Sequence, residues 1–494
     1  MKKLEGFIES LPNISNPEAY GVYPLSINKV EQMWVFMVNQ GSKDVLIAVG
    51  KDSNLFSGQK FTTNNITYVN ADLTHENGEV LRRLFPFTKP IPVLNKMRSF
   101  GLGDRLGIAG PGHIKVFKSY DAYPVFVQQS IRELHLTNRT FEEVLDSATF
   151  YVYRDGYKDG FGADGDHLKK PEEIEYALRL GFTMITLDCS DYIRNDVSKM
   201  TDNAINQSCI LDEKMKSKYL NCVFSVGTSM IEFNEMDLKK SVLIYGKAID
   251  YAVQIYQTYF SDPTHSVNFE ISIDETATPT SPAQHYFVAN ELKSRGVHLD
   301  TMAPRFIGEF QKGVDYVGDI NEFEKELIIH ANIARHFGYK LSIHSGSDKF
   351  SIFQLIGKHT QGHFHVKTAG TNWLEAMRLV AIYDPSLYRD IHKYALSMFS
   401  EAKKFYHVTT DLTKIPNIDT LKDGALEDLF NQNDARQLIH ITYGYILNVK
   451  NPDGTYLFKD KLYHLWREKA DAYSNMLAKH IGKHLELLYS GFKN

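Results

Sequence analysis

The segment 160–169, GFGADGDHLK, brings three glycines, acids, a histidine and a lysine together within ten residues. Glycine permits tight turns and close approach of a ligand to the backbone. A neutral imidazole such as that of His167 binds divalent ions, and an adjacent carboxylate such as that of Asp166 moves protons. The acids would repel phosphate, and the spacing is not that of a phosphate-binding loop. We interpret the segment as a metal and proton-transfer loop that follows a strand, with a solvated turn as the alternative.

Three further residues have types and positions that would complete such a site: Glu270, Glu309 and His344. Like His167, each falls at the predicted carboxyl end of a strand. The set indicates a mixed nitrogen and oxygen site, which suits Zn, Ni, Co, Mn or Fe and needs no thiolate. His363 and His365 are rival ligands, but they come earlier in their strand, and we expect them to pack inside the fold.

Polar residues near predicted strand ends are candidates for binding a substrate: Arg305, Asp348, Lys349 and Lys367. Lysine and arginine pair with carboxylates through charge-assisted hydrogen bonds. Each cation taken singly is as consistent with an ordinary structural ion pair, but together they favour a sugar acid over a neutral sugar. Phosphorylated sugars should be poor substrates, because no glycine-rich phosphate loop accompanies these residues.

These candidates depend on a fold in which short β-rich segments alternate with helices from about residue 100. Alternation of this kind is typical of a parallel sheet, and eight strands is the count of a (β/α)₈ barrel. The predicted strands are Arg105–Ala109, Val125–Gln128, Ala148–Tyr153, Thr183–Asp188, Val267–Ser272, Arg305–Phe310, Leu341–His344 and His363–Lys367. Glycines 181, 296 and 338 are predicted to end three of the helices. An open doubly wound sheet is the runner-up fold.

The predicted strands separate polar from apolar faces, since side chains alternate along a strand. Around Glu270, the neighbours Phe269 and Ile271 share the opposite face, and Thr186 and Asp188 alternate with apolar residues in the same way. The apolar faces should meet the helices, which leaves the polar faces inside the barrel near its active end. The alternative is an antiparallel sheet with one solvated face.

The barrel is predicted to occupy residues 99–380, with an insertion around 190–260. Residues 1–98 carry predicted strands at Met33–Asn39, Val45–Val49 and Phe61–Val69, which indicate a small β-rich cap. Residues 381–494 are predicted to form a helical extension. The fold class is therefore α/β, a TIM-type barrel with additions at both ends.

The composition of the chain indicates which classes of binding partner to expect. A net charge of -5 over 494 residues argues against a nucleic-acid partner bound by electrostatics. The three cysteines form no CxxC pair, and no stretch approaches the ~20 apolar residues of a membrane span. The N-terminal residues lack a signal-peptide core. We expect a cytoplasmic protein that acts on a small molecule and binds no membrane; a homo-oligomer is compatible with the sequence.

Four segments resemble the tagaturonate/fructuronate epimerase family, which is related to the ketohexose 4-epimerases: GFGADGDHLK (160–169), NFEISIDET (268–276), KLSIHSGSDKFS (340–351) and HVKTAGTNWLEA (365–376). The resemblance implies interconversion of D-tagaturonate and D-fructuronate, with a divalent metal, in hexuronate catabolism. It implies that Asp166 and Glu270 are the acid/base pair and that His167 and His344 are metal ligands. We take Glu309 as the third ligand, with Glu270 as its rival.

Within that resemblance, Asn372-Trp373 stands where a Ser-Tyr pair is expected, which bears on the choice of substrate. The two uronates differ at the carbon β to the ketone, whose C–H the carbonyl does not acidify. Simple enolisation cannot invert that carbon, whereas cleavage of the C3–C4 bond in a retro-aldol step can. The alternatives are another metal-dependent sugar isomerase, an aldolase or a ketohexose 4-epimerase on the same barrel, and a non-catalytic carbohydrate-binding protein.

Overall fold

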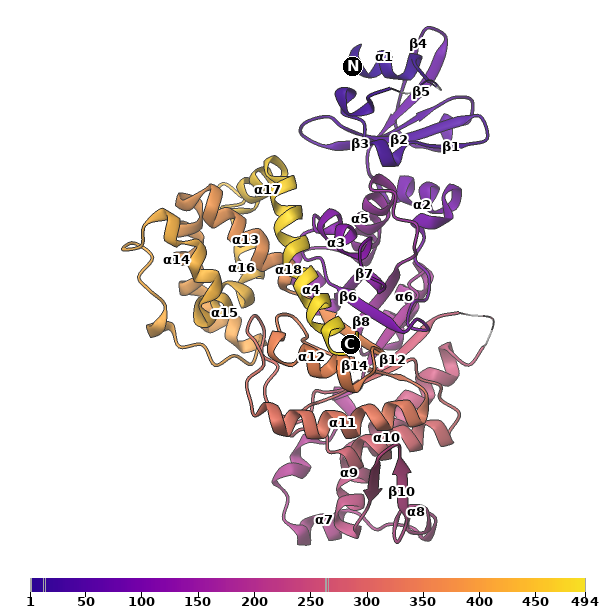
Figure 1. The fold of residues 1–494 in the computed structure, drawn as a ribbon, viewed down its shortest axis with the longest axis vertical. Helices are drawn as coiled ribbons and strands as arrows, with labels where there is room; N and C mark the ends of the chain where they lie inside the picture. The colour runs from indigo at the N-terminus through magenta and orange to yellow at the C-terminus, as the bar shows by residue number, and fades with distance from the viewer. Residues whose placement is uncertain (1, 12, 14, 263, 265, 494) are drawn as a thin grey trace.

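The computed structural model describes residues 2–11, 13, 15–262, 264 and 266–493. Figure 1 shows a central barrel with a small sheet above it, a group of C-terminal helices at its side and an inserted arm below. No helix among these residues is long and apolar enough to cross a membrane.

Eight parallel strands close the barrel in the order β12-β13-β14-β15-β6-β7-β8-β9. This confirms the predicted (β/α)₈ barrel. The strands are β6 (Arg98–Leu102), β7 (Tyr123–Ser130), β8 (Gly162–Leu168), β9 (Met184–Asp188), β12 (Asn268–Ile273), β13 (Thr301–Pro304), β14 (Lys340–Ile343) and β15 (Phe364–Thr368).

Three of the predicted strands are wrong. Arg105–Ala109 follows β6 as a loop, and Arg305–Phe310 lies beyond β13. Ala148–Tyr153 belongs to the helix α5 (Phe141–Arg154). Its aromatic and β-branched residues suit a strand, but the capping box at Thr140 and the packing of the helix decide for α. The third barrel strand is instead β8, the segment that we interpreted as a loop.

Helices cover the outside of the barrel, and the predicted helix ends are confirmed. The covering helices are α3 (Gly110–Phe117), α4 (Ile131–Thr137), α5, α6 (Pro171–Arg179), α9 (Glu235–Tyr259), α10 (Pro282–Ser294), α11 (Ile320–Phe337) and α12 (Phe350–His359). Gly181, Gly296 and Gly338 follow α6, α10 and α11 with φ of 87°, 81° and 85°, a conformation that favours glycine.

The N-terminal cap is an antiparallel sheet in the order β1-β2-β3-β5-β4, with α1 (Lys2–Glu9) and α2 (His75–Leu84) beside it. Its strands are β1 (Asn28–Val30), β2 (Met33–Asn39), β3 (Asp44–Val49), β4 (Gln59–Thr63) and β5 (Ile66–Ala71). The predicted strand Phe61–Val69 is therefore two strands. Asn64 and Asn65 join them with φ of 43° and 64°, a hairpin turn that asparagine tolerates.

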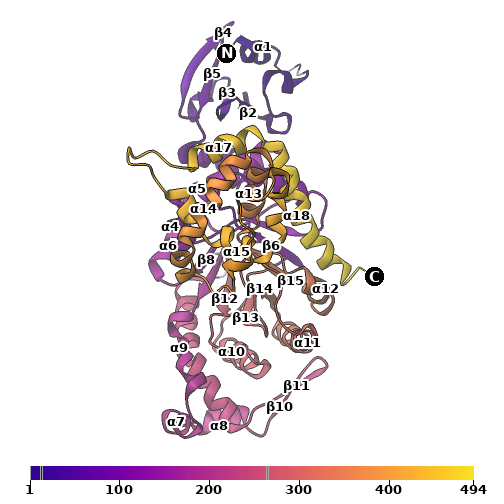
Figure 2. The same cartoon turned by 90° about the vertical axis from the view of Figure 1, so that its left-hand side faces the viewer.

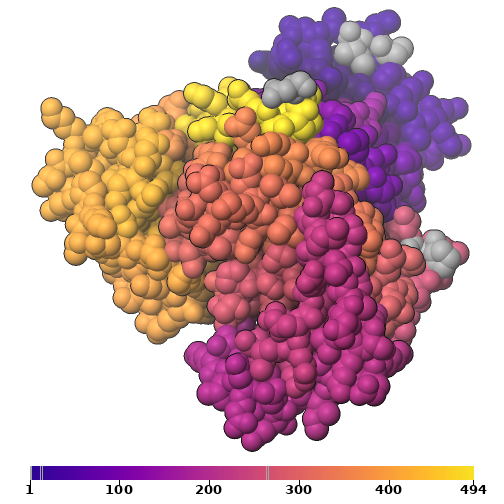
Figure 3. All heavy atoms as spheres, turned by 60° about the horizontal axis from the view of Figure 1, so that its bottom comes forward, coloured from indigo at the N-terminus to yellow at the C-terminus, as the bar shows by residue number. Residues whose placement is uncertain are grey.

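The insertion is an arm that protrudes from the barrel, as Figure 3 shows. It contains α7 (Asp202–Ser208), α8 (Glu213–Tyr219) and a hairpin of β10 (Val223–Val226) with β11 (Ser229–Glu232), and it returns through α9. These elements fill the predicted insertion around 190–260.

The C-terminal helices form a layer that reaches back across the barrel (Figure 2). They are α13 (Thr371–Tyr383), α14 (Pro385–Ala402), α15 (Asn433–Ile441), α16 (Tyr443–Asn448), α17 (Lys459–Glu468) and α18 (Ala470–Ser490). Helix α18 packs between α3 and α12. The approach is close enough that a Cβ on Gly357 would lie 1.9 Å from the carbonyl oxygen of Leu488. The extension is therefore part of the barrel's own packing.

Candidate active site

A buried lysine contacts three acids from two strands inside the barrel. Lys367 Nζ of β15 lies 2.7 Å from Asp164 Oδ2, 2.5 Å from Asp166 Oδ1 and 3.1 Å from Glu270 Oε1. It also donates a hydrogen bond of 2.7 Å to Thr186 Oγ1. Since β8, β9, β12 and β15 each contribute one or two of these groups, closure of the barrel creates the cluster.

Three carboxylates around one ammonium group do not titrate alike. Burial raises the pKa of Asp164 to about 6, against the opposing effect of Lys367. Burial acts on Asp166 and Glu270 in the same direction, but Lys367 and the nearby histidines outweigh it. They lower the pKa of Asp166 to about 2 and that of Glu270 well below its usual value. Asp166 and Glu270 are thus ionised at neutral pH.

A bulge at the end of β8 turns His167 toward this cluster. The pairing of β8 with β9 shifts register between Gly165 and Leu168, and His167 has a φ of 54°. Bulges re-aim side chains, and a non-glycine residue in the left-handed region carries backbone strain of about 1–3 kcal/mol. The bulge brings the consecutive residues Asp166 and His167 to the same cleft, although alternation in a regular strand would place them on opposite faces.

His344 and His167 face each other across the cleft with ring centroids 5.0 Å apart. His344 Nε2 lies 2.7 Å from Glu270 Oε1, and its Nδ1 lies 3.4 Å from Asp274 Oδ2. His167 Nδ1 lies 3.5 Å from Asp188 Oδ2. Burial would lower the pKa of His344, but Asp274 and Glu270 outweigh it and raise that pKa to about 10.

These side chains fit a divalent cation. Two imidazoles surrounded by carboxylates form the mixed nitrogen and oxygen donor set that suits Zn, Ni, Co, Mn or Fe. Ring and carboxylate atoms of His167, Asp188 and Glu275 lie within 4.8 Å of one another. Among the described residues, neither His344 Nδ1 nor His167 Nδ1 has a hydrogen-bond partner, and a cation that binds His344 would replace the proton on its ring.

The cluster opens into a cleft of about 410 Å³ at the carboxyl ends of the strands. Acids and cations both line it. Besides the residues already described, the charged residues of its wall include Arg132, Glu133, Lys169, Glu173, Glu275 and Lys312. A cleft of this size and polarity suits a small hydroxylated molecule.

Two of the predicted site residues lie in a neighbouring hollow that shares His344 and Asp274 with the cleft. Glu309 Oε2 lies 3.2 Å from His407 Nε2, and its other oxygen lies 3.9 Å from Arg305. Arg305 also donates to the carbonyl of Thr276. Among the described residues, Glu309 makes no contact with His167 or His344 within hydrogen-bonding range, so the structure does not bring the predicted metal triad together.

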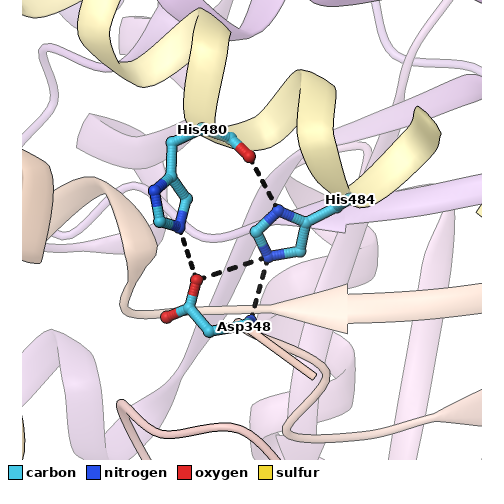
Figure 4. Close-up of side chains that lie close together, drawn as sticks. All are labelled: Asp348, His480 and His484. Atoms are coloured by element: carbon cyan, nitrogen blue, oxygen red, sulfur yellow. Dashed lines mark hydrogen bonds and ion pairs between the residues drawn. The ribbon is translucent and has the colours of Figure 1, made fainter. Parts of the chain in front are cut away.

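Two other predicted residues face away from the cleft. Lys349 is buried, and its Nζ donates to the carbonyls of Gln311, Val314 and Ser347 at 3.0, 2.6 and 3.0 Å. Asp348 is an ion-pair partner of the C-terminal helices, as Figure 4 shows for His480 and His484. These contacts occupy the donors and acceptors that a substrate would need.

Of the two rival histidines, only His365 packs inside the barrel as expected, whereas His363 precedes β15 and is exposed. His365 is buried inside the barrel, where its Nδ1 lies 3.0 Å from Ser99 Oγ. Burial lowers its pKa to about 3. His365 is therefore a neutral packing residue.

Several residues of the cleft, and one partner of Lys367 behind it, were missed from the sequence: Arg132, Asp188, Asp274 and Lys312 in the cleft, and Asp164 behind it. Two of them carried a usable signal. Asp164 precedes Asp166 by two positions on the same strand, and Asp188 ends a strand whose polar face was recognised. The two cations lie in loops or at helix starts, where no periodicity marks them.

The barrel is closed, and its cleft lies at the carboxyl ends of the strands, where barrel enzymes have their active sites. Ionised carboxylates and histidines in and beside this polar cleft are typical of an enzyme that transfers protons on a small polar molecule. Residues 23–488 match the family model described as tagaturonate epimerase. The chain therefore belongs to the tagaturonate epimerase family, whose named members are epimerases, and it is an isomerase that acts on carbohydrates.

Individual relatives support the same family assignment. The chain is 41% identical over 475 residues to the tagaturonate/fructuronate epimerase of Thermotoga maritima, which covers 95% of this chain and 97% of the relative. It is 47% identical to the fructuronate-tagaturonate epimerase of Cohnella laeviribosi, whose native crystal structure superposes with a TM-score of 0.93 over 99% of both chains. A glycerol-complexed structure of the same epimerase gives the same values.

Proposed function

We propose that this enzyme interconverts D-tagaturonate and D-fructuronate in the cytoplasm, as a step of hexuronate catabolism that requires a divalent metal. Full-length similarity to epimerases named for these two sugar acids carries the proposal. The charges of the cleft agree with it, because a keto acid offers both a carboxylate and a carbonyl oxygen to bind.

In the proposed reaction Asp166 and Glu270 alternate as base and acid on the C4 hydroxyl. One carboxylate takes the hydroxyl proton, the C3–C4 bond breaks, and an enediolate and an aldehyde result. The aldehyde rotates, the bond re-forms on its other face, and a carboxylic acid returns the proton to the new hydroxyl. Lys367 contacts both carboxylates, and its positive charge keeps them ionised.

A divalent ion, when bound, supplies Lewis-acid polarisation of the ketone oxygen. His167 and His344 are the residues that we expect to hold it, together with a carboxylate of Asp188 or Asp274. Those two carboxylates approach the histidines, whereas Glu309 pairs with His407.

The first test is turnover of tagaturonate by the purified protein after chelation and after addition of each of the five metals. We expect fructuronate to form only with metal. Elemental analysis should show metal loss in His167→Ala and His344→Ala and retention in Glu309→Ala. Full occupancy in both histidine variants would remove them from the metal site, and loss in Glu309→Ala would restore Glu309 as a ligand.

The retro-aldol step has its own test, since the C4 hydrogen stays on carbon throughout. Turnover in D₂O should therefore place no deuterium at C4, and incorporation there would contradict the step. Asp166→Asn and Glu270→Gln should each lower kcat about 10²–10⁴-fold, as for a positioned acid or base. Near-normal turnover of Asp166→Asn would show that Asp166 is a neighbour of His167 without an acid/base role.

A further inference from the structure

Four cations line the cleft, and two of them are already neutralised. Lys367 is held by three carboxylates at 2.5–3.1 Å. Lys169 Nζ lies 2.8 Å from Asp191 and 3.9 Å from Asp188. Neither has an unmatched charge to offer to a substrate.

Lys312 and Arg132 differ, because no carboxylate among the described residues lies within 4.0 Å of either charged group. Lys312 Nζ donates to a neutral acceptor, Ser345 Oγ, at 3.2 Å. Arg132 lies over the ring of Tyr406 with its guanidinium carbon 5.0 Å from the centroid. Such stacking leaves the guanidinium edge free to bind an oxyanion.

The surroundings of Lys312 make its lack of an anionic partner costly. Burial lowers its pKa, the acids Glu133 and Asp166 act against that shift, and Arg132 and Arg105 add to it. Placing an uncompensated cation in such a site is unfavourable, and an arriving anion relieves the cost.

Both residues also lie where one end of a substrate would reach. Lys312 and Arg132 each line the cleft and the adjoining hollow, so they stand at the junction of the two. Ser345, the partner of Lys312, follows His344 directly in the chain. A ligand whose reacting carbons lie between His344 and Lys367 would extend its other end toward this pair.

We propose that Lys312 and Arg132 form the subsite for the carboxylate of the substrate, in place of the predicted Arg305 and Lys349. The inference rests on the proposed function for its substrate, a six-carbon keto acid. The two cations select the acid over the neutral ketose, because only the acid supplies the missing negative charge.

Lys312→Met and Arg132→Met test the subsite, with Lys404→Met as the matched control. Lys404 precedes Tyr406 by two residues, but it is exposed and paired with Glu401 at 2.5 Å. We expect KM for tagaturonate to rise about 10- to 100-fold in Lys312→Met and Arg132→Met, as for loss of a charge-assisted hydrogen bond. In Lys404→Met it should stay within about twofold, the effect of an exposed ion pair.

Direct binding of glycerate and of its neutral analogue glycerol, measured by calorimetry, gives a second readout that does not depend on turnover. Wild type should prefer glycerate, and both variants should lose that preference while binding of glycerol is unchanged. Unchanged KM and glycerate preference would overturn the subsite, as would an equal loss for glycerate and glycerol. A wild-type enzyme that does not turn over tagaturonate would overturn the proposed function, while glycerate binding would still test the subsite.

Discussion

Lys367 is the residue on which the charge balance of the barrel interior depends. It is the counter-ion of three buried acids, and its own pKa is raised well above the usual value by Asp164, Asp166 and Glu270 in spite of burial. Removal of one partner from a buried ion cluster leaves uncompensated charge and costs about 3–5 kcal/mol. We expect Lys367→Met to lose that much free energy of unfolding in urea at pH 8.

The loss should shrink at pH 5. Without Lys367 the folded-state pKa values of the three acids rise above their unfolded values, so folding of the variant takes up protons and gains stability as the pH falls. The matched control is Lys169→Met, whose exposed pair with Asp191 is worth about 0–1 kcal/mol. Equal losses for Lys367→Met at both pH values would contradict the role as counter-ion.

At the scale of elements, Asp348 ties the C-terminal helices to the loop that begins with His344. Its carboxylate lies 2.6 Å from Arg436 of α15. It also lies 2.5 Å from His480 of α18, as Figure 4 shows. Its backbone N–H donates to His484, which occupies the ring nitrogen that would bind an ion. With Arg436 already on the carboxylate, this cluster is a structural ion network and not a metal site.

We expect Asp348→Asn to lower kcat about 10- to 100-fold with little change in KM. The variant weakens the attachment of the loop that begins with His344, and a small displacement of this proposed metal ligand is enough to slow the reaction. Asparagine tolerates the φ of 63° at this position, so the backbone conformation is kept. The control is Asp315→Asn, which alters a carboxylate that accepts hydrogen bonds from Tyr316 N–H and from Ser351 on α12. Normal kcat in folded Asp348→Asn would show that the network serves stability alone.

The whole molecule carries many histidines that are buried in the neutral form. Burial lowers the pKa values of His113, His330 and His392 to about 4. In the unfolded chain the same groups titrate near about 6.5. Below that pH the unfolded chain binds protons that the folded chain does not, so the free energy of unfolding must fall.

We expect chemical unfolding to show a loss of about 1 kcal/mol in the free energy of unfolding for each such histidine between pH 6.5 and 5.5. His344, whose pKa is raised, adds nothing in this window, because it is protonated in both states below pH 6.5; its stabilisation is lost only as the pH rises toward 10. His392→Phe should reduce the slope by one histidine, since neither ring nitrogen of His392 has a hydrogen-bond partner among the described residues. A flat or rising profile on acidification would contradict this reasoning.

The sequence by itself determined the barrel, most of its strands and the segments that carry the chemistry. These features are local: alternation marks a strand whose faces differ, glycine in the left-handed conformation ends a helix, and acids and histidines mark strand ends. Where two local signals conflicted, as in Ala148–Tyr153, the residue types favoured a strand, and the helix cap with its packing prevailed.

Only the tertiary structure decided which of those residues meet. The bulge at His167 redirects a side chain, and barrel closure sets Lys367 against Asp164, about 200 residues earlier in the chain. The same closure sends the donors of Lys349 to backbone carbonyls and pairs Glu309 with His407. Spacing along the chain fixes the direction of a side chain from its own strand, but its contacts depend on how strands and loops from distant segments pack around it, which no local pattern encodes.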